Sequence, residues 1–547
     1  MIVIRTIILS YFLSIGLFTS AQEIVSKKNI KKSSQLLAAA MQKLDQDDLL
    51  SAEKLIIQST HFNPYNKEAI IALADIKMQQ KDYFDLVKLL EKILTLDPSQ
   101  EKILIHSLFK AYVGIGAFDD ARKKLFIAVK NQSIDSVKYF EYLKWIDFSS
   151  DVSQKNKLID LKVKNLGTAV NSKLSEYFPS VSYADTMLIM TRRINNGQNE
   201  DFFVAVREGR AWKSAVPLAG KINTGFNEGG QKISSDGNLM VFTGCNYPEG
   251  TGSCDLYYAL SNNGTWGERM HFETPINTEY WESAPCLSAD KKTLYFSSNR
   301  PGGFGGMDIY KSNLKQNGHW TEPENLGAAI NTSGDEMFPF IHFDQSSLYF
   351  TSNGWQSLGG SDLFVSRKIG NSFTPPINLG FPINTIDNES GMVVSANGRE
   401  AYFSSDRFGG EGEMDIYSFE LPIEVQAFPV KQSEKIVLHN IQFETAKSEI
   451  KPDSEKTLNV LLQFLRENPH IQIQINGHTD NIGREEDNIL LSNQRAKAVV
   501  DFLVKNGIQQ NRLSFKGFGS SQPIADNETE VGRAFNRRTE MVVLTNK

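Results

Sequence analysis

A repeat of 53 or 54 residues, which governs residues 160–421, constrains the fold of this chain more than any other feature. In each unit an aspartate precedes a hydrophobic and an aromatic residue, at Asp201, Asp255, Asp308, Asp362 and Asp415. Between these triplets Ile-Asn-Thr recurs at 222–224, 276–278, 330–332 and 383–385, and one equivalent position holds Trp212, Trp266, Trp320 or Phe373. Short strands, regular turns and one aromatic residue per unit predict the blades of a β-propeller.

The two ends of this region predict how the propeller closes. The fifth unit begins near Glu389 and stops at Leu421, before the strand that ends each of the other units. A matching strand lies at the start of the region, because residues 161–172 align with residues 324–332. We therefore predict five blades, with the N-terminal strand completing the last blade so that no sheet edge is left free.

The propeller repeats show no sign of catalytic chemistry. Repeated aspartates are compatible with calcium sites and repeated aromatic residues with sugar binding, but Asp-Gly and Asn-Gly also favour tight turns, which is the interpretation we prefer. The whole chain lacks a G-x-S-x-G elbow, an H-E-x-x-H helix and a Walker loop, and its eight histidines do not cluster at ligand spacing. We therefore expect no enzyme, no cofactor and no metal site. The net charge of −6 gives no reason to expect nucleic acid as a partner.

Residues 33–150 follow a different repeat, with a helical pattern and a step near 34 residues. Asn-Pro at 63–64 recurs as Asp-Pro at 97–98, and the pair that starts at Asp48 recurs at Asp82. This pattern predicts an α-helical solenoid, a fold that presents a concave groove to a peptide or a partner helix. A plain helical spacer is the alternative.

The N-terminus predicts export. Residues 1–21 combine Arg5, an apolar run from Ile7 to Phe18 and small residues up to Ala21, as in a signal peptide. The apolar run is shorter than the ~20 residues that a spanning helix needs, although an uncleaved anchor is the alternative. We expect the protein in the periplasm, associated with the outer membrane and the cell wall.

Two of the three cysteines flank an insertion in the second unit. Cys245 and Cys254 enclose residues 246–253, and in an oxidising compartment the pair can form a disulfide. The third, Cys286, is expected to be a buried thiol. A metal site is not predicted, because only two thiols come together and no histidine accompanies them.

Residues 434–547 form a third region, separated from the repeats by a linker at 422–433. Strands are predicted at Ile436–Phe443, 471–475, 513–518 and 541–544, with an amphipathic helix marked by Leu458, Leu461, Leu462 and Leu465. A second helix is predicted from about Asn488 to Asn506, ending before Gly507. These elements predict a compact α/β sandwich.

Three motifs in this region carry a resemblance. They are G-H-T-D-x-x-G from Gly477, N-x-x-L-S-x-x-R-A from Asn488 and G-R-x-x-N-R-R from Gly532. With them, residues 434–547 resemble the peptidoglycan-binding domain of the OmpA C-terminal family. The resemblance implies that the ligand is the meso-diaminopimelate side chain of the peptidoglycan stem peptide, whose free end is a zwitterion.

The resemblance also implies roles for individual residues. Asp480 accepts the ligand's ammonium, and Arg495 binds its carboxylate with the two-pronged geometry of a guanidinium. Thr479 and Asn488 add hydrogen bonds near the loop, and Arg538 contacts the ligand or holds the wall of the pocket. Structural alternatives remain for most of them: a salt bridge for Asp480 and Arg495, and a helix N-cap for Asn488. For Arg538, and for the nearby Arg533 and Arg537, the alternative is a surface ion pair.

The other regions carry looser resemblances. Residues 33–150 resemble tetratricopeptide repeats, and residues 160–421 resemble the WD40-like PD40 family. The order of parts resembles a wall-anchoring component of the type IX secretion and gliding machinery of Bacteroidetes, except that only the 422–433 linker separates propeller and terminal domain. These resemblances imply a non-enzymatic scaffold that binds peptidoglycan and holds outer-membrane or secretion-system proteins. The alternative is a propeller that senses or binds carbohydrate or peptide.

Overall fold

The computed structural model describes most of the chain from Val25 onward. The described residues are 25–158, 160–182, 185–209, 211–234, 237–262, 264–369, 372–422, 425, 435–437, 441, 443, 447–451, 454, 458, 461–462, 465–466, 471–524, 526–528, 533 and 536–546. The predicted signal peptide, residues 1–21, and almost all of the 422–433 linker lie outside them. The chain divides into two compact units. The N-terminal unit comprises Met1–Gln154 and Arg407–Gly409, and the second unit comprises Lys155–Asp406 and Gly410–Lys547.

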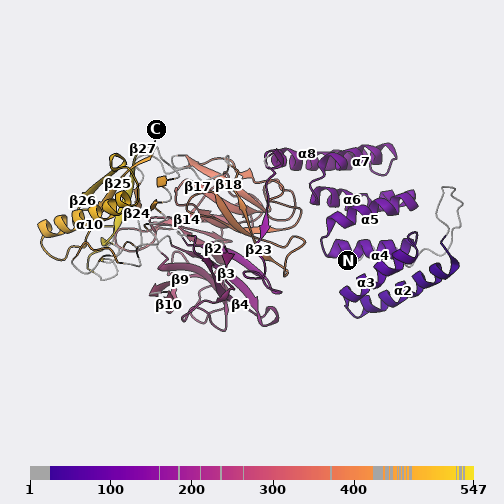
Figure 1. Cartoon of the computed structure of the whole chain (residues 1–547), viewed down its shortest axis with the longest axis horizontal. Coiled ribbons are helices and arrows are strands. Elements are labelled where there is room, and N and C mark those ends of the chain that lie inside the picture. The colour runs from indigo at the N-terminus through magenta and orange to yellow at the C-terminus, as the bar shows by residue number, and fades with distance from the viewer. Residues whose placement is uncertain are drawn as a thin grey trace. The chain divides into compact units, whose positions relative to one another are not determined.

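Helices make up the described part of the N-terminal unit (Figure 1). They are α2 (Lys27–Asp45), α3 (Leu49–Phe62), α4 (Lys67–Gln79), α5 (Tyr83–Leu96), α6 (Glu101–Gly114), α7 (Phe118–Lys130) and α8 (Ser136–Leu158), with a 3₁₀ turn at Pro98–Gln100. Consecutive helices from α2 to α7 contact one another. Among the described residues, no helix is both long and apolar enough to cross a membrane.

Helix caps explain the 34-residue step. Asp48 and Asp82 are the N-caps of α3 and α5. Each side chain accepts the backbone N–H of the residue three positions later, at 3.2 Å. Asn63 and Asp97 are the C-caps of the same helices, and the prolines that follow them cannot continue a helix. The recurring pairs are therefore the start and stop signals of α3 and α5, whereas α7 begins after Ala117 without a side-chain cap.

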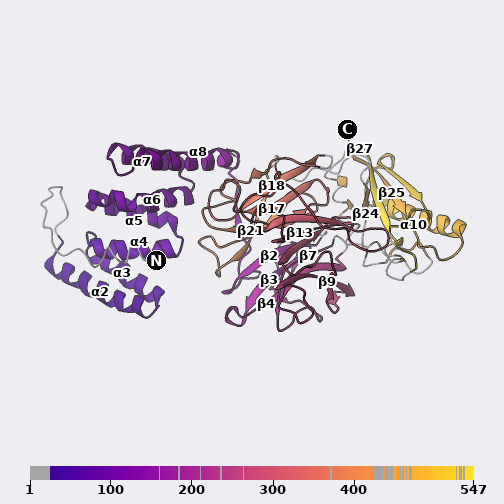
Figure 2. The same ribbon diagram turned by 180° about the vertical axis from the view of Figure 1, so that it is seen from behind.

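Antiparallel sheets make up residues 164–420, and among the described residues there are five of them (Figure 2). Their strands are, sheet by sheet, β2 (Glu176–Val181), β3 (Met187–Ile194), β4 (Asn199–Glu208), β5 (Ala211–Trp212) and β6 (Val216–Pro217); β7 (Asn227–Ile233), β8 (Leu239–Cys245), β9 (Cys254–Asn262), β10 (Thr265–Trp266) and β11 (Met270–His271); β12 (Glu282–Leu287), β13 (Thr293–Ser298), β14 (Asp308–Asn313) and β15 (Glu324–Asn325); β16 (Glu336–Ile341), β17 (Ser347–Ser352), β18 (Asp362–Ile369), β19 (Ser372–Phe373) and β20 (Ile377–Asn378); β21 (Glu389–Val394), β22 (Glu400–Ser405), β23 (Asp415–Glu420) and β1 (Lys164–Asn165).

The first strands of these sheets contact one another in cyclic order. β2 contacts β7, and the series continues through β12, β16 and β21 back to β2. We call this arrangement the five-sheet ring. The start and the end of the repeat region are joined by β1, which adds to the fifth sheet. It pairs antiparallel with β23, with Lys164 opposite Ser418 and Asn165 opposite Tyr417. The sequence alignment predicts this pairing of the N-terminal strand with the last sheet.

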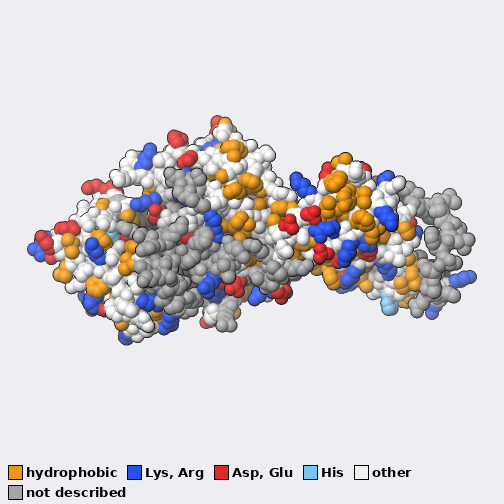
Figure 3. All heavy atoms as spheres, turned by 90° about the horizontal axis from the view of Figure 1, so that it is seen from above, with side chains coloured by type: hydrophobic (Ala, Val, Ile, Leu, Met, Phe, Trp, Pro, Cys, Tyr) orange, Lys and Arg blue, Asp and Glu red, His pale blue; other side chains and the backbone are white. Residues whose placement is uncertain are grey.

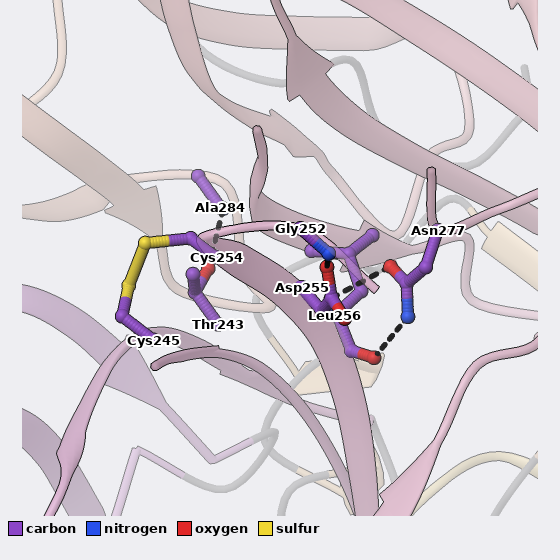
Figure 4. Close-up of a disulfide and its surroundings, with 8 residues drawn as sticks. All are labelled: Thr243, Cys245, Gly252, Cys254, Asp255, Leu256, Asn277 and Ala284. Carbon is purple, nitrogen blue, oxygen red and sulfur yellow. Dashed lines mark hydrogen bonds between the residues drawn. A yellow bond between two sulfur atoms is a disulfide. The ribbon is translucent and has the colours of Figure 1, made fainter. Parts of the chain in front are cut away.

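The repeated motifs hold turns and connections in the five-sheet ring. Asp255 accepts the backbone N–H groups of Thr251 and Gly252, and the repeated aspartates at 308 and 415 bind their own preceding turns in the same way. The asparagine of Ile-Asn-Thr binds both backbone groups of the residue after that aspartate; Asn277 does so with Leu256 (Figure 4). Among the described residues, no cluster of three or more His, Cys, Asp or Glu side chains is arranged to hold a metal ion.

The cysteines lie in the second and third sheets of the ring. Cys245 at the end of β8 and Cys254 at the start of β9 form a disulfide with an S–S distance of 1.99 Å (Figure 4). Cys286 in β12 is a buried free thiol. The disulfide closes the loop that the insertion forms.

The C-terminal region is an α/β domain. Its strands are β24 (Lys435–Val437), β25 (Ile471–Gly477), β26 (Leu513–Gly517) and β27 (Thr539–Asn546), in the order β24-β27-β25-β26, with β25 and β26 parallel. Helix α10 (Glu485–Lys505) packs on β25 and β26. The predicted leucines at 458, 461, 462 and 465 are buried in the core with Ile473 and Ile475. The predicted start of the second helix at Asn488 was wrong by three residues, because Glu485, Glu486 and Asp487 form its first turn, where acidic side chains stabilise the helix N-terminus.

Candidate ligand-binding site

The predicted site residues surround the loop that joins β25 to α10. Glycine is required where the strand ends, because a Cβ atom on Gly477 would lie 2.1 Å from the carbonyl oxygen of Ser492 in α10. Gly483 has a φ of +97° and lets the loop turn into the helix. The loop between these glycines therefore lies tightly against the helix that carries Arg495.

Asp480 lies in this loop and is largely buried. Its Oδ2 accepts a hydrogen bond from Nη1 of Arg537 at 2.6 Å, and its Oδ1 accepts the backbone N–H of Ile482 at 3.1 Å. Arg537 precedes β27, the strand next to β25 in the sheet. The carboxylate is therefore ion-paired, but its partner is Arg537 and not Arg495.

Arg495 lies on α10 and is half-buried. Its Nε donates to the carbonyl oxygen of Lys447 at 3.1 Å, and its guanidinium carbon lies 5.0 Å from the centre of the Phe443 ring. Burial lowers the pKa of Arg495, the positive charge of Arg537 lowers it further, and the negative charge of Asp480 acts in the opposite direction. The two guanidiniums thus share one electrostatic environment around a single carboxylate.

Thr479 and Asn488 hold the loop. Oγ1 of Thr479 donates to the carbonyl of Asp480 at 2.9 Å, and Nδ2 of Asn488 donates to the carbonyls of Ile482 at 3.1 Å and Asp480 at 3.4 Å. Asn488 is not a helix N-cap, because the N-cap of α10 is Arg484. Both side chains are buried, so in this structure they fix the backbone that presents Asp480.

Arg538 faces the interior of the domain. Its Nε and Nη2 donate to Oε1 of Glu540 at 2.9 and 2.7 Å, and its Nη1 donates to the carbonyl of Gln522 at 3.1 Å. Nε2 of His478 lies 3.2 Å from the other oxygen of Glu540, and the His478 ring stacks on Phe518. Burial acts to raise the pKa of Glu540, but the neighbouring His478 and the charge of Arg538 outweigh it and lower this pKa to about 2.

Comparison with known proteins bears on this part of the chain. Residues 442–537 match the OmpA family. This part of the chain is an OmpA family domain. The chain is 41% identical over 115 residues to outer membrane porin F of Pseudomonas fluorescens, covering 21% of this chain and 35% of the porin. It is 47% identical over 92 residues to the peptidoglycan-binding protein ArfA of Mycobacterium bovis, covering 17% of this chain and 28% of that protein.

A solved structure is also similar. The peptidoglycan-associated lipoprotein of Burkholderia pseudomallei is 28% identical and covers 19% of this chain and 87% of that chain, with a TM-score of 0.18. The chain spans about a third of the length of the two curated relatives described above. The similarity to those relatives extends over about a fifth of this chain.

Two partners in the OmpA family domain were missed by sequence reasoning. Arg537 was weighed between a ligand contact and a surface ion pair, without Asp480 as its partner, and Glu540 was not singled out. A signal for Glu540 was present, because residues two apart on a strand share a face of the sheet and Arg538 and Glu540 flank the start of β27. The sequence does not distinguish Arg537 from Arg538 as the partner of Asp480. The two arginines are adjacent and point to opposite sides, and the sequence does not say which side faces the loop.

Proposed function

We propose that the chain is a non-enzymatic periplasmic scaffold whose OmpA family domain binds peptidoglycan non-covalently through meso-diaminopimelate. The observation that carries the proposal is the ion pair of Asp480 with Arg537 in a loop that packs tightly against α10, the helix that carries Arg495. A zwitterion with an ammonium and a carboxylate complements such a set of charges. The name of the mycobacterial relative, a peptidoglycan-binding protein, supports peptidoglycan as the polymer that is bound.

Each charged group has a role in this proposal. The ligand's ammonium is bound by Asp480, whose carboxylate can accept from it beside Arg537. The ligand's carboxylate is bound by Arg495, which among the described residues donates only through Nε and so offers its two Nη groups. Thr479 and Asn488 hold the loop, and Arg538 holds the domain interior behind it.

Co-sedimentation of the full-length mature protein with purified sacculi tests this proposal. Asp480→Ala removes the counter-charge of the ammonium, and Arg495→Ala leaves the ligand carboxylate unpaired, a loss on the order of 2–5 kcal/mol for one member of such a pair. Both variants are expected to remain in the supernatant. Free meso-diaminopimelate should compete with sacculi for the parent protein, whereas Nα-acetyl-lysine amide, whose free end carries an ammonium but no carboxylate, should not.

The matched control is Lys497→Ala, two residues after Arg495 on α10. Lys497 is exposed, and among the described residues it pairs only with Asp501 one helical turn away. This variant should sediment with sacculi as the parent does. If the Asp480 and Arg495 variants also sediment like the parent, the diaminopimelate assignment is wrong and the domain is a protein-docking module.

For the rest of the chain we propose a tetratricopeptide-like solenoid and a five-bladed propeller that hold outer-membrane or secretion-associated proteins, as in type IX secretion or gliding machinery. The regular caps of α3 and α5 and the closed cycle of five sheets support these folds. Hydrophobic side chains gather on the surface of the helical unit (Figure 3). On α7 and α8 the exposed ones include Phe126, Val137 and Phe140, each more than 60% exposed. Exposed apolar surface of this kind is typical of protein interaction sites.

Affinity purification from crosslinked cells tests the scaffold proposal. The parent should capture outer-membrane proteins that a variant with Phe126→Ser, Val137→Ser and Phe140→Ser does not capture. Capture that does not change in the triple variant would contradict docking on the helical unit.

A further inference from the structure

The centre of the five-sheet ring contains an unusual backbone feature in every first strand. Each of these strands has a register shift, and beside it a residue with positive φ. These residues are Phe178, Gly230, Ala284, Phe338 and Gly391, with φ between 51° and 63°. Because the five strands contact one another in cyclic order, the five residues lie at equivalent positions around one axis.

Two of these residues close the axis. The rings of Phe178 and Phe338 stack with their centres 4.3 Å apart and their planes at 28°. They belong to the first and fourth sheets, which are not neighbours in the ring, so they meet across its centre. Gly391 leaves room for this pair, because a Cβ atom there would lie 2.9 Å from Cδ1 of Phe178. The stacked pair is therefore a floor and not part of an open channel.

A cavity of about 290 Å³ lies on this floor. Its walls come from four of the sheets and include Trp281, Met337, Glu200 and Asp335. We call it the axial cup. The wall is braced, because the N–H of Ala284 donates to Oγ1 of Thr243 at 2.9 Å next to the Cys245–Cys254 disulfide (Figure 4).

The surface of the cup selects an apolar group. Two phenylalanine rings, the half-exposed indole of Trp281 and the thioether of Met337 are large and polarizable, and methionine adapts its shape to an inserted side chain. The volume is close to the lower limit for small-molecule sites. The cup thus has room for one apolar side chain and little more.

Two carboxylates in the wall of the axial cup, Glu200 and Asp335, favour a positively charged group in the ligand. Glu200 accepts from the Tyr177 hydroxyl and lies 3.7 Å from Arg193, so its charge is partly compensated. Asp335 accepts the backbone N–H of Met307 and Nδ2 of Asn353, each at 2.9 Å, and among the described residues it has no salt-bridge partner. A cation placed beside the apolar group would complement Asp335.

We propose that the axial cup binds an apolar side chain of a partner polypeptide that carries a lysine or arginine next to it. This site is independent of the OmpA family domain. It gives the ring a recognition function in addition to its proposed role as a scaffold.

A peptide titration of the full-length mature protein tests the proposal. The probe is N-acetyl-Gly-Phe-Lys-Gly-amide, and binding is measured by calorimetry. Replacing its Phe by Ala removes the apolar anchor, and replacing its Lys by Glu reverses the charge opposite Asp335. Each replacement is expected to weaken binding at least tenfold.

Variants of the protein complete the test. Met337→Lys places a cation in the wall of the cup and should weaken binding of the Phe-Lys probe at least tenfold, whereas Met270→Lys, on the outer strand β11 and not in the cup, should bind it as the parent does. Unchanged far-ultraviolet circular dichroism establishes that both variants are folded. No binding to the parent at millimolar probe, equal binding by Met337→Lys, or equal binding of the Ala or Glu probe would each overturn the proposal.

Discussion

At the scale of single residues, the OmpA family domain separates two kinds of arginine. Arg495 and Arg537 lie at the loop with Asp480, where a charged ligand can reach them, whereas Arg538 is buried against Glu540. One residue along the strand reverses the side to which a side chain points, so adjacent arginines pair with Asp480 in the loop and with Glu540 in the interior.

Replacing Arg538 by methionine is expected to destabilise the domain. The change leaves the carboxylate of Glu540 buried with only His478 beside it, and breaking such a buried pair costs about 3–5 kcal/mol. Residues 434–547 contain no tryptophan or tyrosine, so hydrogen exchange of β27 in the full chain is the suitable measurement. β27 should exchange faster in Arg538→Met. The control Arg484→Met, whose surface pair with Asp487 is exposed, should leave exchange unchanged.

At the scale of elements, polar side chains cap the N-termini of α2, α3, α4 and α5, while burial decides which charges are tolerated inside. Asp75 on α4 is an exception to the usual placement of charges. It borders a small cavity among apolar side chains such as Leu86 and Leu90, and among the described residues its carboxylate makes no hydrogen bond or ion pair. Burial raises the pKa of this carboxyl to about 6.

Asp75→Asn is therefore expected to stabilise the helical unit in a pH-dependent way. The pKa of Asp75 is about 4 in an unfolded chain and about 6 in the folded one, so its ionisation disfavours folding increasingly between these pH values and fully above about 6. The amide of the variant cannot ionise, so the gain should be about 1–3 kcal/mol at pH 7.5 and vanish below about pH 4. Melting followed at 222 nm measures it. Asp151→Asn, on the exposed face of α8, should show no such gain, and an equal gain at pH 4 would contradict the electrostatic cause.

At the scale of the whole molecule, one hydrogen-bond motif recurs between the sheets of the five-sheet ring and also joins its two ends. Each asparagine of the Ile-Asn-Thr positions binds both backbone groups of a residue in the preceding sheet, usually about 21 or 22 residues away. Asn171 makes the same two bonds with Ile416, which is 245 residues away. These bonds and the pairing of β1 with β23 join the first and last sheets.

Asn171→Ala is expected to loosen the ring at its closure. The change leaves the buried N–H of Ile416 without its partner, which costs about 1–3 kcal/mol, whereas the C=O of Ile416 still accepts the N–H of Leu166 at 3.1 Å. Hydrogen exchange should rise in β23 and in residues 164–172. Asn331→Ala removes the same bonds to Ile309 inside the ring and should raise exchange only near β14. Full protection of β23 in Asn171→Ala would show that the closure does not depend on this residue.

Much of this architecture follows from the sequence alone. The 34-residue and 53- or 54-residue steps arise from caps, turns and connecting hydrogen bonds between residues near in sequence, so the same residue types recur at the same spacing. Even the long-range closure could be predicted, because residues 161–172 repeat a pattern whose partner strand was known from the other units. The loop from Gly477 and the helix with Arg495 were likewise fixed by local glycine and apolar patterns.

Only the tertiary structure decided the pairings that depend on side-chain direction across distant segments. Asp480 pairs with Arg537, 57 residues away, because β27 lies beside β25 in the sheet and brings that guanidinium to the loop. The stacking of Phe178 on Phe338 depends on the cyclic order of the five first strands, which brings side chains of non-neighbouring sheets together across the axis. Sequence patterns determine which face a residue occupies, but which partner it meets is determined by how separate elements pack.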